Sequence, residues 1–98
     1  MAITIDSILV PSEDIVTREI EGELIIVPLV AGIGDLEDEL FTLNDTGKAI
    51  WRKLDGTLSL KEVVNILVNE YDAPVDEIEE DVLGLAGELV NRRMLIES

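Results

Sequence analysis

The sequence contains no cysteine and no histidine. This chain therefore cannot form a disulfide, a thiolate metal site or an iron–sulfur cluster held by cysteines, and it has no cysteine nucleophile or histidine base. Asp35–Glu39 and Asp76–Asp81 are acidic clusters, but neither has the ligand spacing of a calcium loop. We expect a protein that is not an enzyme and that binds no cofactor or metal of its own.

Aromatic and basic residues are scarce. Aromatics make up 3% of the chain, so Ile, Leu and Val must build most of the core, with Phe41, Trp51 and Tyr71 as its few large pieces. The chain has seven basic and 22 acidic residues, and its net charge is −15. This charge disfavours nucleic acid and anionic membranes as partners. It is compatible with a neutral or basic peptide, and it is also what solubility alone would require.

Long hydrophobic runs are missing as well. The longest nearly apolar stretch, Leu24–Gly34, contains Pro28 and is too short to span a bilayer. The first residues lack the basic start and apolar region of a signal peptide. We expect one cytoplasmic domain over residues 1–98, with a lead-in at 1–11, strands within 12–43, helices within 44–93 and a tail at 94–98.

The central stretch Leu43–Gly56 predicts a strand that runs directly into a helix. Phe41 and Leu43 alternate with a polar residue, as in a half-buried strand, and Asn44 is a suitable N-cap. The helix is expected over about 45–54, with Gly56 after its end. Basic residues near this helix form a small patch, too sparse for nucleic acid but able to meet an acidic partner surface: Lys48, Arg52, Lys53 and Lys61.

The N-terminal half predicts an antiparallel sheet. Ile15–Ile20 and the run that begins at Leu24 form a hairpin around Glu21–Glu23, and Asp38–Leu43 is the third strand. The lead-in either pairs at a sheet edge or remains loose.

The C-terminal half predicts two longer helices. Ser59 and Glu62 form a capping box that starts one helix, which ends near Asp72, and another runs from about Val75 to Arg92. The fold class is therefore α+β, winged-helix-like, with an N-terminal three-stranded antiparallel sheet followed by three helices. A winged-helix regulator would share this pattern, but its recognition helix would be basic, and this last helix is acidic.

The last helix has an unusually wide apolar surface. Its apolar positions span roughly 160° at ~100° per residue, which exceeds the face that one-sided packing needs. Either the sheet covers the excess, or part of this surface meets another molecule. Gly84 and Gly87 lie inside the helix at a cost of about 1 kcal/mol each. They either permit close approach of another backbone or are simply tolerated.

One pattern resembles a known family. Leu-Asn-x-Thr-Gly-x-x-Ile-Trp-x-x-Leu-Asp-Gly over residues 43–56, followed by Ser-x-x-Glu at 59–62, is similar to the PqqD family of peptide carrier domains, also called RiPP precursor recognition elements. The resemblance extends from about Ser12 to Ile96. The sequence departs from the family pattern at Asn91–Leu95, where a Gly turn is usual, and in its acidic link before the third strand.

The resemblance implies a binding site between the third strand and the third helix. There the leader of a precursor peptide adds as another antiparallel strand, through backbone hydrogen bonds and side-chain pockets. The implied peptide-binding residues are Glu39, Leu40, Phe41, Thr42, Ile78, Asp81, Val82 and Leu85. Some of these residues must belong to the core instead. Phe41 is expected to face inward and to act through its backbone. Asp81 either accepts a hydrogen bond from the peptide or is a solvated carboxylate.

The resulting hypothesis is a non-catalytic adaptor that presents a peptide to a modifying enzyme. The family implies a radical SAM enzyme as this partner, in the biosynthesis of pyrroloquinoline quinone or of another peptide product. The alternative is a self-associating structural domain, in which the edge of the third strand pairs with its own copy as a homodimer.

Overall fold

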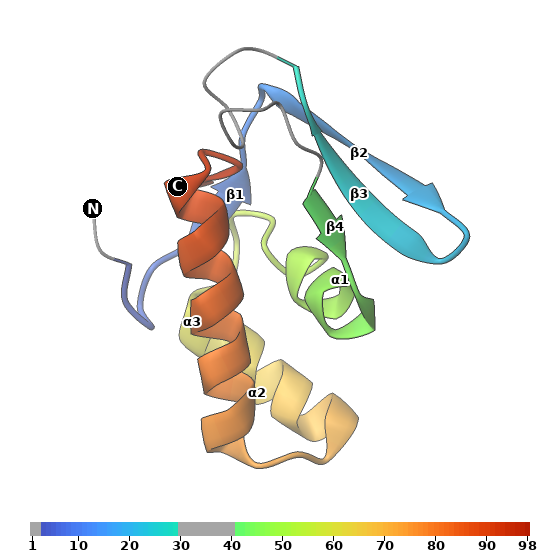
Figure 1. Cartoon of the computed structure of the whole chain (residues 1–98). Coiled ribbons are helices and arrows are strands. Elements are labelled where there is room, and N and C mark those ends of the chain that lie inside the picture. Colours follow the sequence, from blue (N-terminus) through green and yellow to red (C-terminus); the bar gives the residue numbers. More distant parts are fainter. Residues whose placement is uncertain (1–2, 30–40) are drawn as a thin grey trace.

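The computed structural model describes residues 3–29 and 41–98. Figure 1 shows the β2, β3 and β4 strands on one side, α2 and α3 on the other, and the short α1 between them. In chain order the elements are β1 (Leu9–Pro11), β2 (Ile15–Ile20), β3 (Glu23–Pro28), β4 (Phe41–Leu43), α1 (Asp45–Trp51), α2 (Leu60–Tyr71), α3 (Val75–Asn91) and β5 (Leu95–Glu97).

The main sheet has the order β2-β3-β4 and is antiparallel throughout. The β2–β3 hairpin closes through Glu21 and Gly22, whose φ values of 52° and 85° are both in the left-handed region that a tight two-residue turn requires. In the second pairing Leu24 lies opposite Leu43 and Ile26 opposite Phe41. The expected three-stranded antiparallel sheet followed by three helices is confirmed. The third strand was predicted over Asp38–Leu43, and its part before Phe41 lies outside the described residues.

The lead-in and the tail form a second, two-stranded sheet. β1 pairs with β5 in antiparallel register, with Val10 opposite Ile96. The lead-in is also tied to the start of α2, because the Leu60 and Lys61 amides donate to the carbonyls of Ser7 and Ile5 at 2.9 and 2.8 Å. The lead-in is therefore paired rather than loose.

The expected helix starts are confirmed at atomic detail. The Gly47 amide donates to Asn44 Oδ1 at 2.8 Å at the start of α1. At the start of α2, the Ser59 amide donates to Glu62 Oε1 and the Glu62 amide to Ser59 Oγ, which is the reciprocal pattern of a capping box.

α1 ends at Trp51, three residues before the expected Leu54. The Lys53 and Leu54 amides donate three residues back, to Ile50 and Trp51, at 3.0 Å each. This tighter turn ends the α-helical pattern early.

The end of α3 shows how the departure near Asn91–Leu95 is accommodated. The Arg93 amide donates to the Val90 carbonyl at 3.0 Å, and the Met94 amide to the Leu89 carbonyl at 2.9 Å. These two hydrogen bonds form a turn in which Arg93 has a φ of 61°, a backbone conformation that favours Gly. The buried side chains of Leu89 and Met94 flank the turn, so packing holds it without the glycine.

The core is aliphatic with one large aromatic, Trp51, at 7% exposure. The expectation that Tyr71 belongs to it was wrong: Tyr71 is 51% exposed, because α2 ends there and the chain turns into α3. The fully buried large side chains come from every layer: Leu9, Ile26, Ile50, Leu54, Leu60, Leu67, Leu89, Met94, Leu95, Val63, Val64 and Val82. Within the described residues, no helix is both long and apolar enough to cross a membrane.

Candidate functional site

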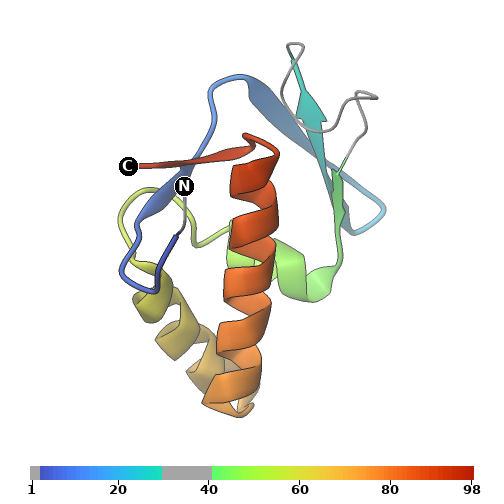
Figure 2. The same cartoon turned by 60° about the vertical axis from the view of Figure 1, so that its left-hand side comes forward.

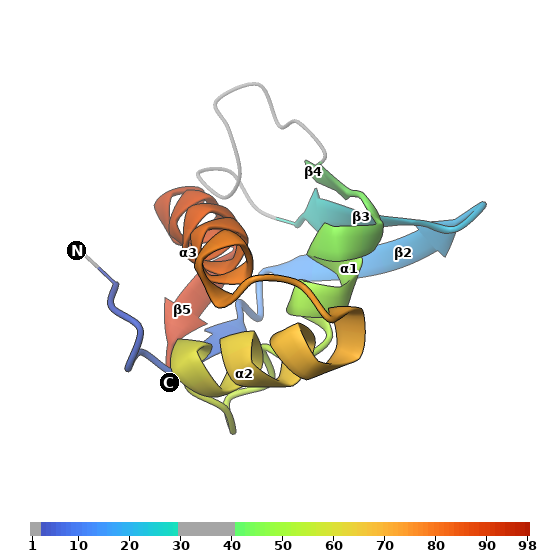
Figure 3. The same ribbon diagram turned by 90° about the horizontal axis from the view of Figure 1, so that it is seen from below.

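A groove of about 610 Å³ separates β4 and the start of α1 from α3. Figure 3 shows α3 on one side and β4 with α1 on the other, and Figure 2 shows β4 alongside α3. The volume lies within the usual range for ligand sites. The described residues that line the groove are Phe41, Asn44, Thr46, Gly47, Ile50, Glu80, Asp81, Gly84, Leu85 and Glu88.

The first wall is built by the direct passage from β4 into α1. Asn44 caps the helix with its side chain, so the chain needs no loop between the two elements. Gly47 allows this tight junction: a Cβ at this position would lie 3.2 Å from Leu43 Cδ2 and 3.3 Å from Asn44 Oδ1. The wall therefore has a defined position relative to the sheet.

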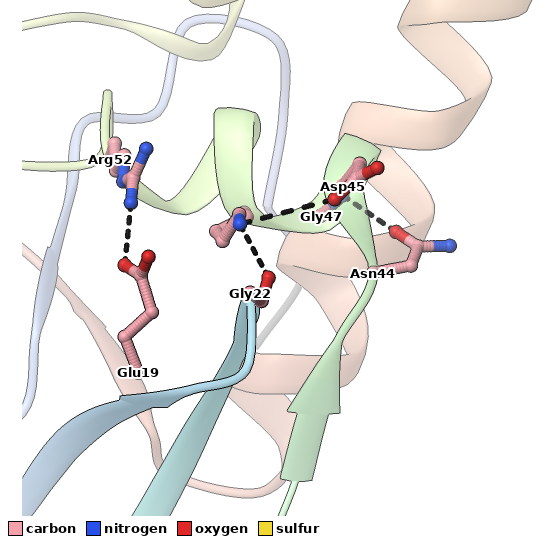
Figure 4. A network of polar contacts seen from close by, with 7 residues as sticks. Glu19, Gly22, Asn44, Asp45, Gly47 and Arg52 are labelled. Atoms are coloured by element: carbon pink, nitrogen blue, oxygen red, sulfur yellow. Dashed lines mark hydrogen bonds and ion pairs between the residues drawn. The ribbon is translucent and has the colours of Figure 1, made fainter.

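A hydrogen bond and two ion pairs join α1 and the residues just after it to neighbouring elements. Lys48 Nζ donates to the Gly22 carbonyl in the hairpin turn, and Arg52 pairs with Glu19 of β2 at 2.7 Å (Figure 4). Lys53 pairs with Glu70 of α2 at 3.3 Å. Most of the small basic patch expected from the sequence is therefore engaged within the chain.

The second wall is one face of α3. Its lining residues follow helical spacing, with Asp81 and Leu85 one turn apart and Gly84 and Glu88 also one turn apart. A Cβ built at Gly84 or Gly87 meets no described atom within 4 Å. Neither glycine is therefore needed for close packing within the described chain. Because Gly84 has no side chain, no side chain projects into the groove from this position.

One end of the groove is bridged by Arg92. Its guanidinium carbon lies 5.0 Å from the centroid of the Phe41 ring, within the range of a cation–π contact. The same guanidinium donates to Glu88 Oε1 at 3.0 and 3.2 Å. Arg92 thus links the α3 wall to β4 and neutralises Glu88.

The two shortest N-terminal strands differ in how their edges are used. β1 pairs with β5 on one side, and its Leu9 carbonyl also accepts from the Gly56 amide at 3.0 Å. β4 pairs with β3 on one side. Among the described residues, Phe41–Leu43 make no backbone hydrogen bond outside that pairing. The β4 edge toward the groove thus offers peptide groups for a further strand.

Only some of the residues expected at the site line the groove. Phe41, Asp81 and Leu85 line the groove, and Thr42 is exposed on β4. Ile78 and Val82 are instead buried in the core, at 6% and 0% exposure. They share the helix face of Ala86 and Leu89, so their side chains stabilise the fold and do not line the groove. Glu39 and Leu40 lie outside the described residues.

Several lining residues were not expected. Those on α3, namely Glu80, Gly84 and Glu88, could have been found from helical spacing around Asp81 and Leu85. Those at the start of α1, namely Asn44, Thr46 and Gly47, could not, because their place in the groove depends on how α1 packs against the sheet.

The described residues contain no group of three or more His, Cys, Asp or Glu side chains placed to hold a metal ion. A lowered pKa is found at Asp55, chiefly because its carboxylate accepts from the Thr57 hydroxyl and then from the Thr57 amide. Asp55 is not among the residues that line the groove.

Comparison with known proteins gives one matching family. The model of coenzyme PQQ synthesis protein D (PqqD) matches residues 23–95. A relative from Xanthomonas campestris pv. campestris (strain B100) is 36% identical over 58 residues, which are 59% of this chain and 63% of the relative. A relative from Rhizobium meliloti (strain 1021) is 38% identical over 58 residues, 59% of each chain. Both are named PqqA binding protein, and the match spans less than two thirds of either.

Two solved structures share the fold. The PqqD truncation of Methylobacterium extorquens PqqCD, described as a stand-alone RiPP recognition element, has a TM-score of 0.74 and 23% identity over 97% of this chain and 95% of that one. TbiB1 in complex with the TbiA(beta) leader peptide has a TM-score of 0.71 and 23% identity over 88% and 93%. At this identity the likeness concerns the fold alone. Because the family model matches most of the chain, this protein belongs to the PqqD family.

Proposed function

We propose that this chain is an adaptor that binds the leader of a ribosomally made precursor peptide as an added strand beside β4. The observation that carries the proposal is the groove between β4 and α3, which borders a strand edge without another backbone partner among the described residues. The names of relatives and the complex of TbiB1 with a leader peptide support a peptide leader as the ligand.

The β4 backbone would provide orientation and part of the affinity. A strand of three residues offers few hydrogen bonds, and each contributes about 0.5–1.5 kcal/mol net. These bonds do not depend on the peptide's side chains, so they cannot select one peptide from another. Selection must come from the groove walls, where the half-buried Phe41 and Leu85 offer apolar surface.

The second part of the proposal concerns an enzyme partner. An adaptor acts by tethering, which raises the effective concentration of the peptide core at the enzyme that modifies it. Membership of the PqqD family supports pyrroloquinoline quinone synthesis as the pathway. The radical SAM enzyme is the partner that the family resemblance implies, and any cofactor would be held by that enzyme. In this proposal the partner enzyme carries out the chemistry, and this chain holds the peptide close to that enzyme.

The test is an NMR titration of the ¹⁵N-labelled chain with the leader regions of short peptides encoded beside its gene. We expect saturable shifts at Phe41–Leu43 and Gly84–Glu88, with β1 and β5 as the internal control that stays unchanged. Saturable shifts at β1 and β5 alone, or none with any such leader, would contradict the proposal.

Light scattering over a dilution series separates this function from self-association. An adaptor with a free β4 edge keeps one molecular mass on dilution. A mass that falls on dilution, together with loss of leader binding at high concentration, would show that a second copy occupies the edge.

A further inference from the structure

Among the described residues, the ionisable side chains that line the groove are all acidic. They are Glu80, Asp81 and Glu88, and all three are exposed. Glu88 is already paired with Arg92 at 3.0 Å. Charge is therefore compensated at the Arg92 end of the groove and uncompensated at the end formed by Glu80 and Asp81.

Within the described residues, no Lys or Arg side chain forms an ion pair at this second end. All seven Lys and Arg residues lie within the described ranges. The ion pairs found there join Lys48, Arg52, Lys53 and Arg92 to other carboxylates, and none includes Glu80 or Asp81. The N-terminus of α3 contributes roughly +0.5 charge through its dipole. Residues 76–81 include five carboxylates, so the local charge remains strongly negative.

The direction of the strands also determines the order in which a bound peptide passes the groove residues of α3. In Figures 1 and 2, β4 runs alongside α3 and in the opposite direction. A peptide that pairs antiparallel to β4 therefore runs parallel to α3, so it meets Asp81 before Leu85. In a strand, every second side chain points the same way, and these side chains are ~6.6 Å apart. This spacing is close to the ~5.4 Å rise of one helical turn, which separates Asp81 from Leu85 on α3.

From these observations we infer that the groove selects a basic leader. The occupant is a peptide strand that carries Lys or Arg opposite Glu80 and Asp81, followed two residues later by an apolar residue opposite Leu85. This inference rests on the proposed function, because it names the class of peptide for the same groove. The basic residue supplies the positive charge that no Lys or Arg of the described chain places there.

The test uses selection from a phage-displayed library of random 12-residue peptides against the whole chain. Three proteins are compared: the natural sequence, the double variant E80K/D81K, and the control D6K/E97K. Asp6 and Glu97 are exposed and lie outside the groove lining, and the control raises the net charge by the same amount. The control therefore separates a local effect of the groove from overall charge.

The natural chain and the control should both enrich peptides with Lys or Arg followed two positions later by an apolar residue. E80K/D81K should lose this pattern, and one enriched peptide should bind it about three- to tenfold more weakly, as expected for two exposed charge pairs. Groove-binding peptides without a basic preference would overturn this inference and leave the adaptor function standing. If none of the enriched peptides shifts the NMR resonances of the groove residues, both the basic-leader inference and the adaptor function are contradicted.

Discussion

The two faces of α3 have different compositions and different tasks. The core face, Ile78, Val82, Ala86 and Leu89, is at most 6% exposed. The groove face carries three acidic residues, a glycine and the half-buried Leu85. Leu85 and Ala86 are neighbours in sequence, yet one borders the groove and the other is buried. One helix can thus hold the fold together and present a binding surface, and single substitutions should separate the two properties.

The largest effect is expected on the core face. Leu89→Ala removes a fully buried side chain, so we expect a loss of about 2–5 kcal/mol in the free energy of unfolding. Urea denaturation of both proteins measures this loss. A change of a few tenths of a kcal/mol would show that Leu89 is not part of a close-packed core.

The matched substitution on the other face is Leu85→Ala. Because Leu85 is half-buried at the groove, we expect a stability loss below about 1.5 kcal/mol. Loss of its apolar contact should weaken leader binding by about tenfold. Denaturation and calorimetric titration measure the two effects. A large stability loss with unchanged binding would place Leu85 in the core and contradict the division of the helix.

The two glycines of α3 provide a more sensitive comparison. Gly84→Ala and Gly87→Ala should each raise the free energy of unfolding by about 1 kcal/mol, because Ala is the better helix former and neither new Cβ meets a described atom. For a domain of this size the corresponding rise in Tm is about 4–8 °C.

Only Gly84 lines the groove, so only Gly84→Ala should weaken leader binding. Gly87→Ala is the control, with the same chemical change on the same helix. Equal effects of both substitutions on binding would mean that the peptide does not approach α3 at Gly84.

The smallest effect is expected at Asp55, a reference carboxylate outside the groove. Its hydrogen bonds to Thr57 lower its pKa below 3.8, so ionised Asp55 favours the folded state. This stabilisation is present above pH 3.8 and is lost as the pH falls through the lower pKa of the folded state.

The excess stability of the natural chain over Asp55→Asn should therefore shrink as the pH falls below 3.8, in denaturation curves recorded side by side. Thr57→Val, which removes the hydroxyl donor, should reduce this pH dependence. A difference between the natural chain and Asp55→Asn that stays constant with pH would show that the hydrogen bond does not favour the ionised form.

Local interactions explain what could be predicted from the sequence. The Asn44 cap and the Ser59–Glu62 capping box depend on residues three apart, and both helix starts were predicted correctly. The hairpin at Glu21 and Gly22 likewise depends on neighbouring residues.

Interactions between distant segments explain what could not be predicted. β1 pairs with β5 across most of the chain length, and no local pattern in either strand indicates the other. The same limit applies to α3, where the apolar stripe did not reveal that Ile78 and Val82 face the core while Leu85 faces the groove. That division depends on where the sheet and α1 lie against the helix.

The central claim is that a peptide occupies the β4 edge beside α3. An isotope-filtered NOE experiment on the labelled chain with an unlabelled leader peptide tests it most directly. The account predicts Hα–Hα contacts of antiparallel pairing between the peptide and Phe41–Leu43, together with contacts from peptide side chains to Leu85. Contacts confined to β1 and β5, or to the outer face of the β2–β3 hairpin, would contradict it.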